Sequence, residues 1–366
     1  MKVGIVTYHR SHNYGAMLQA AALQTALTQM GHDVWFIDYW PEHQRNIYRL
    51  FPKHALRRTG IRGKIRILAS TLKGLPGVLR RRAAFHRFFR RMIEPFCQSA
   101  NAKFDVIVYG SDQIWRKQLD GSGYNPVYFG NNSFRADRHL AYAASMGKLP
   151  ETEQDRHLVH RLLKPLSSIS VREADLQVYL TNSGLQKVAL VSDPVFLLSS
   201  ANWSRLAGES PIEPQAYLVF YDLLPIPKGI EKVCHFAHCL HLNPVRIAGR
   251  AERHPDKCSR LSAGPYEFLN LLKFSDYVVT SSFHGLAFAL LFHKPFLAIF
   301  PSNAGRAKTL LASVGLQHRL VPADEPFVPH PEQIDWNHVD QALKSMREAS
   351  VDWLSIHLQP EKGNRP

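Results

Sequence analysis

Two serines followed directly by a His-Gly pair form the motif in this sequence with the clearest chemical potential. An apolar run over residues 277–280 predicts a buried strand that ends at Ser281 and Ser282, and an apolar helical pattern begins at His284. A serine there can cap the helix, whose free N–H groups and positive dipole end suit a phosphate or carboxylate. His284 would then act beside the anion as an acid or base near neutral pH. The alternative is a capping histidine that bonds a neighbouring loop.

Charged residues follow two other predicted strands. Arg172 ends one strand, and its guanidinium suits bidentate contact with a phosphate; the alternative is an ion pair with Glu173 or Asp175. Asp193 ends the next strand, but an Asp before a proline more often forms a turn. We therefore expect Arg172, rather than Asp193, to hold a ligand.

Two polar loops also follow predicted strands. Their residues are Asn13, Tyr14 and Gly15 in the first and Ser111, Asp112 and Gln113 in the second. Parallel α/β sheets bind ligands beyond the carboxyl ends of their strands, so both loops are candidate substrate contacts. Neither loop matches Gly-x-Gly-x-x-Gly or a Gly-Lys-Ser/Thr phosphate loop, which disfavours nicotinamide and ATP chemistry. A Gly-x-Ser-x-Gly nucleophile motif is missing too.

A cluster of cysteines and histidines offers side chains of the kind that bind metals. Cys234, His238 and His241 share one face of a predicted helix, and Cys258 is a possible fourth ligand. This spacing matches no standard zinc module, and small buried cysteines with surface histidines explain it equally well. We expect no metal and no cofactor.

The elements that position these residues alternate as strands and helices along 366 residues, which is more than one ordinary core supports. We predict an α/β protein with two doubly wound Rossmann-like domains and a basic helical insertion. The predicted units are an N-terminal domain over residues 1–200 that includes the insertion 43–93, a linker 201–214, a C-terminal domain 215–332, and a C-terminal helix and tail 333–366. The linker is inferred from its Ser, Gly and Pro residues.

The individual elements follow from apolar periodicity. Predicted strands cover residues 2–8, 34–38, 104–109, 138–144, 168–171 and 188–191, then 217–221, 245–248, 277–280 and 296–300. Predicted helices cover residues 16–30, 151–163, 228–241, 265–273, 284–292, 305–314 and 333–358. Two such domains would form a cleft for a small anionic or nucleotide ligand.

The net charge of +15 comes from one segment. Residues 43–93 contain 15 Lys and Arg residues and no Asp or Glu, and the remaining basic residues equal the 30 acidic ones. Apolar residues alternate with the basic ones, which predicts amphipathic helices that contact an anionic membrane, each basic group adding about 1 kcal/mol. A solvated insertion is the alternative. Nucleic acid fits less well, because stacking aromatics are not interleaved with the basic residues.

Four scattered cysteines and an N-terminus that enters a strand directly predict a reducing compartment and no signal peptide. The longest apolar runs fall far short of the roughly 20 residues that span a bilayer. We expect a cytoplasmic protein with peripheral contact to the inner face of the plasma membrane.

Six segments together resemble the polysaccharide pyruvyl transferase family. They are residues 3–8 with 13–19, residues 109–115, 142–147, 170–173 and 192–194, and the Ser281 to Gly285 motif, in the family's order along most of the chain. The resemblance implies a fold like the B-type glycosyltransferases. It also implies transfer of the enolpyruvyl unit of phosphoenolpyruvate to hydroxyls of a sugar or lipid-linked oligosaccharide acceptor, which gives a pyruvate ketal.

The resemblance also suggests roles for the candidate residues. His284 would act as the general acid or base, and Asp112 would order the acceptor hydroxyls. Arg172 would hold the donor anion with the helix start at Ser281 and Ser282 and with Lys294.

The helix start departs from the family pattern at one position. Some family members carry Arg-Leu-His-Gly where this chain has Ser282 to Gly285, so anion binding is expected to depend on Arg172, Lys294 or Arg306. Two alternatives to this function are a nucleotide-sugar-dependent glycosyltransferase of the same fold and a non-catalytic membrane-associated binding protein.

Overall fold

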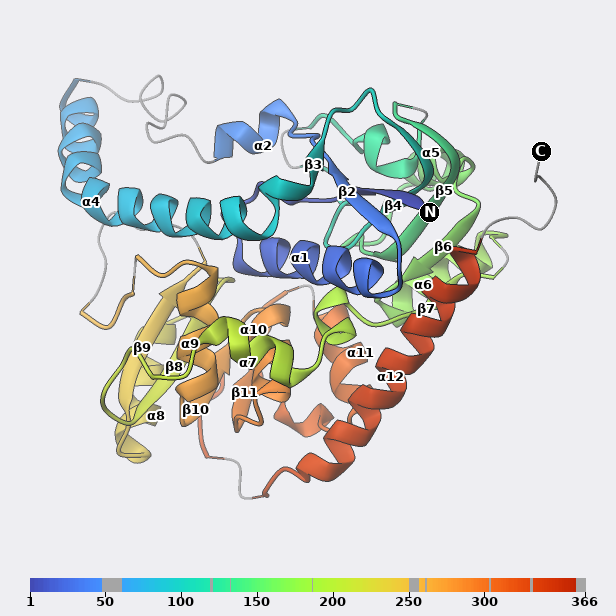
Figure 1. Ribbon diagram of the computed structural model, residues 1–366. Helices are drawn as coiled ribbons and strands as arrows, with labels where there is room; N and C mark the ends of the chain where they lie inside the picture. Colours follow the sequence, from blue (N-terminus) through green and yellow to red (C-terminus); the bar gives the residue numbers. More distant parts are fainter. Residues whose placement is uncertain are drawn as a thin grey trace.

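The protein is described here from a computed structural model that covers residues 1–47, 61–118, 121–131, 133–185, 187–249, 257–260, 262–302, 304–329 and 332–359. Two sheets organise the chain (Figure 1). The larger has seven strands in the order β3-β2-β1-β4-β5-β6-β7, and the smaller has four in the order β11-β10-β8-β9. Every pair of neighbouring strands in both sheets is parallel.

The larger sheet uses strands from the first half of the chain. They are β1 (Lys2–Val6), β2 (Asp33–Ile37), β3 (Cys97–Gln98), β4 (Lys103–Tyr109), β5 (Arg135–Ala144), β6 (Ser168–Val171) and β7 (Ala189–Leu190). The smaller sheet consists of β8 (Tyr217–Asp222), β9 (Asn243–Ala248), β10 (Tyr277–Thr280) and β11 (Phe296–Ala298).

Helices connect and cover the strands. The α-helices are α1 (Tyr14–Gln29), α2 (Glu42–Ile47), α4 (Ile61–Met92), α5 (Glu153–Leu163), α6 (Ala174–Asn182), α7 (Ser200–Ala207), α8 (Gly229–Cys239), α9 (Pro265–Phe274), α10 (Phe283–Leu291), α11 (Gly305–Ser313) and α12 (Trp336–His357). Short 3₁₀ turns are η1 (Glu94–Phe96), η2 (Pro126–Phe129), η3 (Pro194–Leu197) and η4 (Gln317–Arg319).

The strands are apolar because both faces of each sheet are buried. In β4, Val106 and Val108 face one hydrophobic cluster, while Ile107 and Tyr109 face a second cluster on the opposite side. This period of two, without a polar face, is typical of parallel sheets covered by helices on both sides. The prediction of an α/β fold with two doubly wound sheets is confirmed.

Besides the short 3₁₀ turns, the described part of the chain contains one strand and two α-helices that the apolar pattern did not indicate: β3, α6 and α7. Helix α7 falls within the stretch predicted as a linker. Ser199 and Asn202 form a capping box at its start, and Trp203 is fully buried. The connection between the two sheets therefore begins with a packed helix rather than a loose segment.

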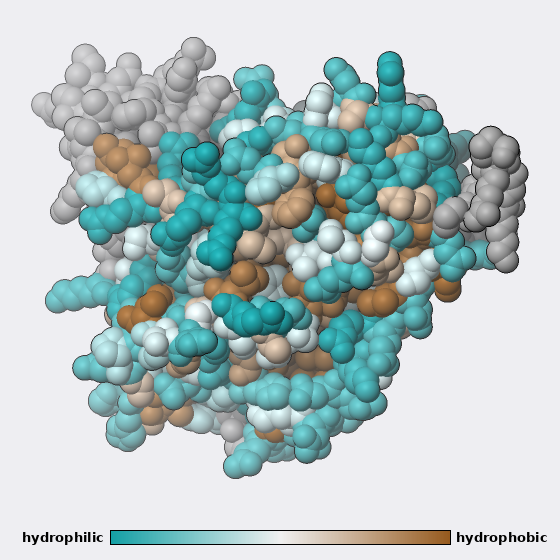
Figure 2. All heavy atoms as spheres, viewed as in Figure 1, coloured by the Kyte–Doolittle hydropathy of each residue, from teal (hydrophilic) through white to brown (hydrophobic). Residues whose placement is uncertain are grey.

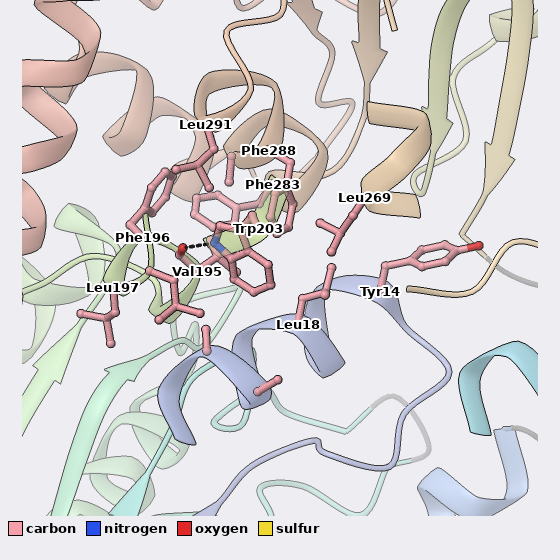
Figure 3. Close-up of a cluster of buried hydrophobic side chains, with 14 of the residues drawn as sticks. Tyr14, Leu18, Val195, Phe196, Leu197, Trp203, Leu269, Phe283, Phe288 and Leu291 are labelled. Atoms are coloured by element: carbon pink, nitrogen blue, oxygen red, sulfur yellow. Dashed lines mark hydrogen bonds between the residues drawn. The ribbon is translucent and has the colours of Figure 1, made fainter. Parts of the chain in front are cut away.

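One hydrophobic cluster joins the two halves of the chain (Figure 3). Leu18 from α1 and Val195 from η3 meet Trp203 from α7 and Phe288 from α10 in this cluster. The Trp203 indole donates a hydrogen bond to the carbonyl of Val195 at 2.9 Å, and its ring packs edge-on against Phe288. Burial of such large rings contributes several kcal/mol each, so the halves pack as one body.

The basic insertion contains one long helix, α4, which Figure 1 shows bent and extending away from the body. Pro76 lies within it, and a proline removes a backbone hydrogen bond and kinks a helix. Residues 48–60 of the predicted insertion lie outside the described residues. Arg81 is only 3% exposed and donates hydrogen bonds to the carbonyls of Ala248 and Gly249. This end of α4 therefore packs across both halves of the protein with one face, while Arg80, Arg87 and Arg91 on it are exposed.

Helix α12 also joins the two halves, and Figure 1 shows it running along the side of the molecule. Near its start Asp340 accepts a hydrogen bond from His293, which follows α10. Near its end Ser350 contacts the backbone N–H of Ser192 at 2.9 Å, on the loop after β7. The helix thus fixes the position of the β7 loop relative to the second sheet.

The viewed face of the molecule is largely hydrophilic, and its hydrophobic atoms form small separate patches (Figure 2). Among the described residues, no helix combines the length and the apolar character that crossing a bilayer requires.

Candidate active site

Loops from both halves of the chain meet where the strands of the larger sheet end. From the first half come the start of α1 and the loops after β4, β5, β6 and β7; from the second half come the starts of α10 and α11. Ligands of doubly wound proteins bind at this edge. We call this region the cleft cluster and define it as Gly15, Ser111, Asp112, Ser145, Arg172, Glu173, Asp193, Ser282, His284 and Arg306.

His284 lies against the first turn of α1. A Cβ added to Gly15 would lie 1.9 Å from the Nδ1 atom of His284, so only glycine permits this approach. A Cβ on Gly285 would lie 2.2 Å from the hydroxyl of Thr280, so α10 also starts in close contact with β10. The N-termini of α1 and α10, one from each half of the chain, therefore meet at the imidazole. Two positive dipole ends that face each other favour an anion between them.

Arg172 is almost fully buried at the end of β6. Its guanidinium pairs with Asp193, lies 3.3 Å from the carboxylate of Asp112, and donates to the hydroxyl of Ser111 at 3.2 Å. Its charged carbon lies 5.3 Å from the centre of the Phe283 ring. Arg172 is thus held by two carboxylates, and a ligand anion would meet only part of its charge.

Asp193 belongs to the cluster, although the sequence pointed to a turn former. It does form the turn, because one carboxylate oxygen accepts from the N–H of Val195 at 3.1 Å. The other oxygen contacts Arg172 and lies 3.7 Å from Nε2 of His284. Burial alone would raise the pKa of Asp193, but Arg172 and His284 hold that pKa below its usual range. The carboxylate can therefore orient both the imidazole and the guanidinium.

Glu173 and Arg306 extend the cluster toward α11. The Glu173 carboxylate accepts a hydrogen bond from Ser145, and the same oxygen lies 3.7 Å from Nε of Arg306. Burial raises the pKa of Glu173 despite the opposing effects of Arg172 and Arg306. Burial and the nearby Arg172 lower the pKa of Arg306. The ring of Phe283 lies 5.7 Å from the Arg306 guanidinium, so Phe283 contacts both arginines.

Several buried polar atoms in the cluster make no hydrogen bond to the part of the chain that the structure describes. They are Nε of Arg172, Oε2 of Glu173, Oγ of Ser282 and Nε2 of His284. Buried polar groups are normally paired, because an unpaired one costs about 1–3 kcal/mol. Four such atoms lie in the cleft cluster, and each calls for an explanation such as a bound ligand or an ordered water.

A pocket opens beside these residues. Its walls are Met146, Gly147 and Leu149 from the loop after β5, Glu173 at the start of α6, and Arg306 at the start of α11. Both halves of the chain therefore contribute to it.

Some predicted site residues have structural contacts instead. The Ser281 hydroxyl accepts hydrogen bonds from the N–H groups of Leu223 and Leu224 in the second half. The Asn13 side chain caps α1 by accepting from the N–H of Ala16 at 3.1 Å. Serine capping of α10 was expected, but the Ser282 side chain makes no capping hydrogen bond.

Tyr14 was predicted to contact the substrate, but its side chain is fully buried and packs within the protein. Its ring stacks on Phe268 with centroids 4.6 Å apart, and its hydroxyl donates to the carbonyl of Ala263. The Gln113 side chain lies behind the pocket, where a Cβ on Gly147 would contact it at 2.7 Å. Tyr14 therefore joins the two halves of the protein, and Gln113 supports a pocket wall.

Lys294 is not part of the cleft cluster. It follows the C-terminal end of α10, whereas His284 lies at the N-terminal end of that helix. Lys294 precedes β11 and interacts with Asp276, which precedes β10, so it lies at the opposite edge of the smaller sheet. The structure therefore does not bring Lys294 together with His284, because one whole helix separates the two residues.

The cysteines and histidines of residues 234–258 were not expected to bind a metal. Cys234 is exposed and Cys258 is half-buried. Among the described residues, no three His, Cys, Asp or Glu side chains gather closely enough to hold a metal ion.

Solved structures similar to this chain include two sugar-nucleotide enzymes. A glycosyltransferase from Streptomyces sp., complexed with thymidine diphosphate, is 12% identical, with a TM-score of 0.47 and coverage of 98% of this chain and 100% of that chain. UDP-GlcNAc 2-epimerase from Methanocaldococcus jannaschii, in complex with UDP-GlcNAc and UDP, is 13% identical, with a TM-score of 0.44 and coverage of 98% and 99%. Because both TM-scores are below 0.5, the fold assignment depends on strand order and pairing alone.

A search of curated proteins gives no match. The family model described as polysaccharide pyruvyl transferase matches residues 13–303, which is most of the chain. The matched segment contains the loops after β4, β6 and β7 and the start of α10. The chain belongs to the polysaccharide pyruvyl transferase family.

Proposed function

We propose that this transferase moves the pyruvyl group of phosphoenolpyruvate to two hydroxyls of one sugar in a glycan precursor, and so forms a pyruvate ketal. The observation that carries the proposal is the position of His284. Its imidazole lies between the N-termini of α1 and α10, and Nε2 is 3.7 Å from the buried Asp193 carboxylate. An acid–base group next to an anion site is what protonation of a phosphorylated enol requires.

The proposed reaction begins at the methylene carbon of the donor. His284, in its imidazolium form and oriented by Asp193, delivers a proton to this carbon, and the central carbon becomes electrophilic. One sugar hydroxyl adds to the central carbon and loses its proton. The second hydroxyl then displaces phosphate, which leaves with a proton, and the ketal ring closes. Asp112, half-buried beside Arg172, is the candidate for ordering the hydroxyls.

Donor binding in this proposal uses helix termini more than side-chain charge. The unpaired hydroxyl of Ser282 and the first N–H groups of α10 would contact phosphate or carboxylate oxygens. The Nε atom of Arg172 has no hydrogen-bond partner among the described residues and would supply one more donor.

The direct test is phosphate release from phosphoenolpyruvate in the presence of sugar acceptors. We expect His284→Ala to lower kcat by at least about 100-fold, the usual contribution of a general acid. His293→Ala is the matched control, because His293 is partly exposed and pairs with Asp340 at the far end of α10. Full activity of His284→Ala would refute the role of His284. Calorimetric binding of nucleotide sugars but not of phosphoenolpyruvate would refute pyruvyl transfer and support the glycosyltransferase alternative.

We also propose that α4 brings the enzyme to a membrane carrying lipid-linked acceptors. Arg80, Arg87, Arg90 and Arg91 are exposed on α4, opposite the buried face that includes Phe88. Such a contact would be electrostatic and therefore weakened by salt. Sedimentation with vesicles containing about 30% phosphatidylserine tests it, with neutral vesicles as the control. Equal binding to both vesicle types would contradict it.

A further inference from the structure

A second group of cations lies outside the cleft cluster, where α4 meets the loop between β1 and α1. His12 belongs to this loop, and its ring centre is 5.4 Å from that of Phe85 in α4. Three cationic or basic side chains of α4 lie close enough to His12 for their charges to act on it: Arg81, Arg82 and His86. We call these three residues and His12 the α4 cation cluster. The reaction outlined above uses none of them.

The cluster is built around a buried guanidinium. Arg81 is 3% exposed, and its charged carbon lies 4.7 Å from the centre of the Tyr14 ring and 5.0 Å from that of Phe85. Within the described part of the chain, its hydrogen bonds go to neutral oxygens, those of the Tyr14 hydroxyl and of the Ala248 and Gly249 carbonyls. Buried charges are normally paired, so an anion placed near this guanidinium would be stabilised.

The acids on this side of the molecule are committed to other cations. Glu267, in the first turn of α9, pairs with Arg87 and accepts from the N–H of Gly264. Asp38, after β2, accepts hydrogen bonds from two nitrogens of Arg10. The α4 cation cluster therefore keeps an excess of positive charge among the residues that the structure describes, in contrast to the arginines of the cleft cluster.

The surroundings of His12 are those of an anion site that a ligand can reach. Burial, and to a smaller extent the charges of Arg82 and Arg81, lower the pKa of His12 to about 4. The same positive potential that resists a proton there attracts a negative ligand. His12 and Arg82 are half-buried and His86 is exposed, so their nitrogens can contact phosphate oxygens.

The cluster also lies within reach of the proposed reaction centre. His12 is three residues before Gly15, so their Cα atoms are at most about 11 Å apart. Gly15 in turn contacts the imidazole of His284. In a pyranose the anomeric carbon lies across the ring from the fourth carbon. A sugar that presents hydroxyls of that end to His284 can therefore place an anomeric phosphate at the cluster.

We propose that the α4 cation cluster binds a diphosphate on the anomeric carbon of the acceptor, which makes the acceptor a diphosphate-linked sugar; this inference rests on the proposed function. Arg82, His86 and His12 contact the phosphate oxygens, and Arg81 adds its charge from the buried side. No bond to the diphosphate forms or breaks, because the ketal closes at the other end of the sugar. The diphosphate belongs to a nucleotide or to a carrier lipid, which present the same charge to the cluster.

The first experiment measures calorimetric binding of inorganic pyrophosphate to the full chain. We expect Arg82→Gln to raise the Kd at least about tenfold, the effect of losing one charge-assisted hydrogen bond. Arg90→Gln is the matched control, because Arg90 is an exposed arginine of the same helix that pairs with Glu94; its Kd should stay within about twofold of the wild-type value. No pyrophosphate binding by the wild type, or equal binding by Arg82→Gln, would overturn the site.

The same variant separates the acceptor from the donor. Phosphoenolpyruvate should bind Arg82→Gln within about twofold of its wild-type Kd, which also shows that the variant is folded. A parallel loss of phosphoenolpyruvate binding would assign the cluster to the donor and overturn its role in acceptor binding.

A competition experiment separates the two sources of the diphosphate. Displacement of pyrophosphate by UDP supports a nucleotide-linked acceptor, and displacement by farnesyl diphosphate supports a lipid-linked one. If neither compound displaces pyrophosphate, the proposal is wrong. If pyrophosphate binds as expected but the enzyme releases no phosphate from phosphoenolpyruvate, the diphosphate site stands and the proposed donor fails.

Discussion

Replacing Gly15 by alanine tests whether the close contact between α1 and His284 matters for catalysis. The Gly15 backbone lies in an ordinary helical turn, so the only obstacle to alanine is the space that the imidazole occupies. The new Cβ would lie 1.9 Å from Nδ1 of His284, whereas an ordinary contact begins at 3.4 Å. The imidazole or the helix must therefore move by about 1.5 Å, the difference between these two distances.

A displacement of that size has a predictable cost. Misplacing a catalytic group by about 1 Å lowers the rate by about 100-fold, so we expect at least this loss in kcat/KM, or about 3 kcal/mol of transition-state stabilisation. The folded state should also lose about 1–3 kcal/mol, the usual cost of overpacking. Phosphate release from phosphoenolpyruvate measures the first effect, and urea denaturation measures the second.

The control for Gly15→Ala must create a similar clash between the two halves of the protein without touching the imidazole. Gly264→Ala does so, because its new Cβ would lie 2.6 Å from the Cβ of Ala84, where α4 meets the start of α9. We expect Gly264→Ala to lower stability by a similar amount and to keep activity within a few-fold. If Gly15→Ala retains more than a third of wild-type kcat/KM, the position of His284 is not critical. Equal activity losses in both variants would trace the effect to packing of the halves.

Two further predictions concern stability. Burial, and to a smaller extent the charges of Arg82 and Arg81, lowers the pKa of His12 from 6.5 to about 4. The unfolded chain therefore binds a proton at a higher pH than the folded protein does. As the pH is lowered from 6.5 to 4, the free energy of unfolding of the wild type should therefore fall by about 3 kcal/mol more than that of the His12→Gln variant. If the free energies of unfolding of the two proteins change in parallel with pH, this prediction is contradicted. Trp203→Ala should lower the free energy of unfolding, measured by urea denaturation, by about 3–5 kcal/mol. The control is Trp35→Ala, because Trp35 is only half-buried. If Trp203→Ala costs no more than Trp35→Ala, the core shared by the two halves is not critical for stability.

Much of the fold could be predicted because buried parallel strands are read as continuous apolar runs. The bounds of β6 and β10 coincide with their predicted ranges, and most other strands agree within three residues. Helix α7 was hidden by its composition, since serine, glycine and proline around it indicated a linker. Its stability depends on burial of Trp203 against α10, a contact between distant parts of the chain that local propensity does not contain.

The candidate site was predicted less completely than the fold. The sequence singled out the strand ends, and the structure brings His284, Arg172 and Asp112 together there. The sequence could not show that Arg172 pairs with Asp193, because the two residues lie on different loops that only the sheet brings together. Arg306 was considered for anion binding, but its contact with Glu173 joins two halves of the chain and likewise depends on tertiary structure. Residues that act across a domain boundary leave no spacing pattern in the sequence.

The charge of the cleft cluster constrains how the proposed donor is held. Arg172 faces Asp193 and Asp112, and Arg306 faces Glu173, so the side chains offer no excess of positive charge to a phosphorylated carboxylate. Two helices compensate, because α1 begins beside Gly15 and α10 begins beside His284, where these two residues are in contact. Each N-terminus contributes about half a positive charge, or about +1 in total, fixed by the fold. If the donor binds as proposed, its affinity would depend on how closely the two halves pack, and the buried end of α4, helix α12 and the core around Trp203 would act on donor binding without contacting the donor.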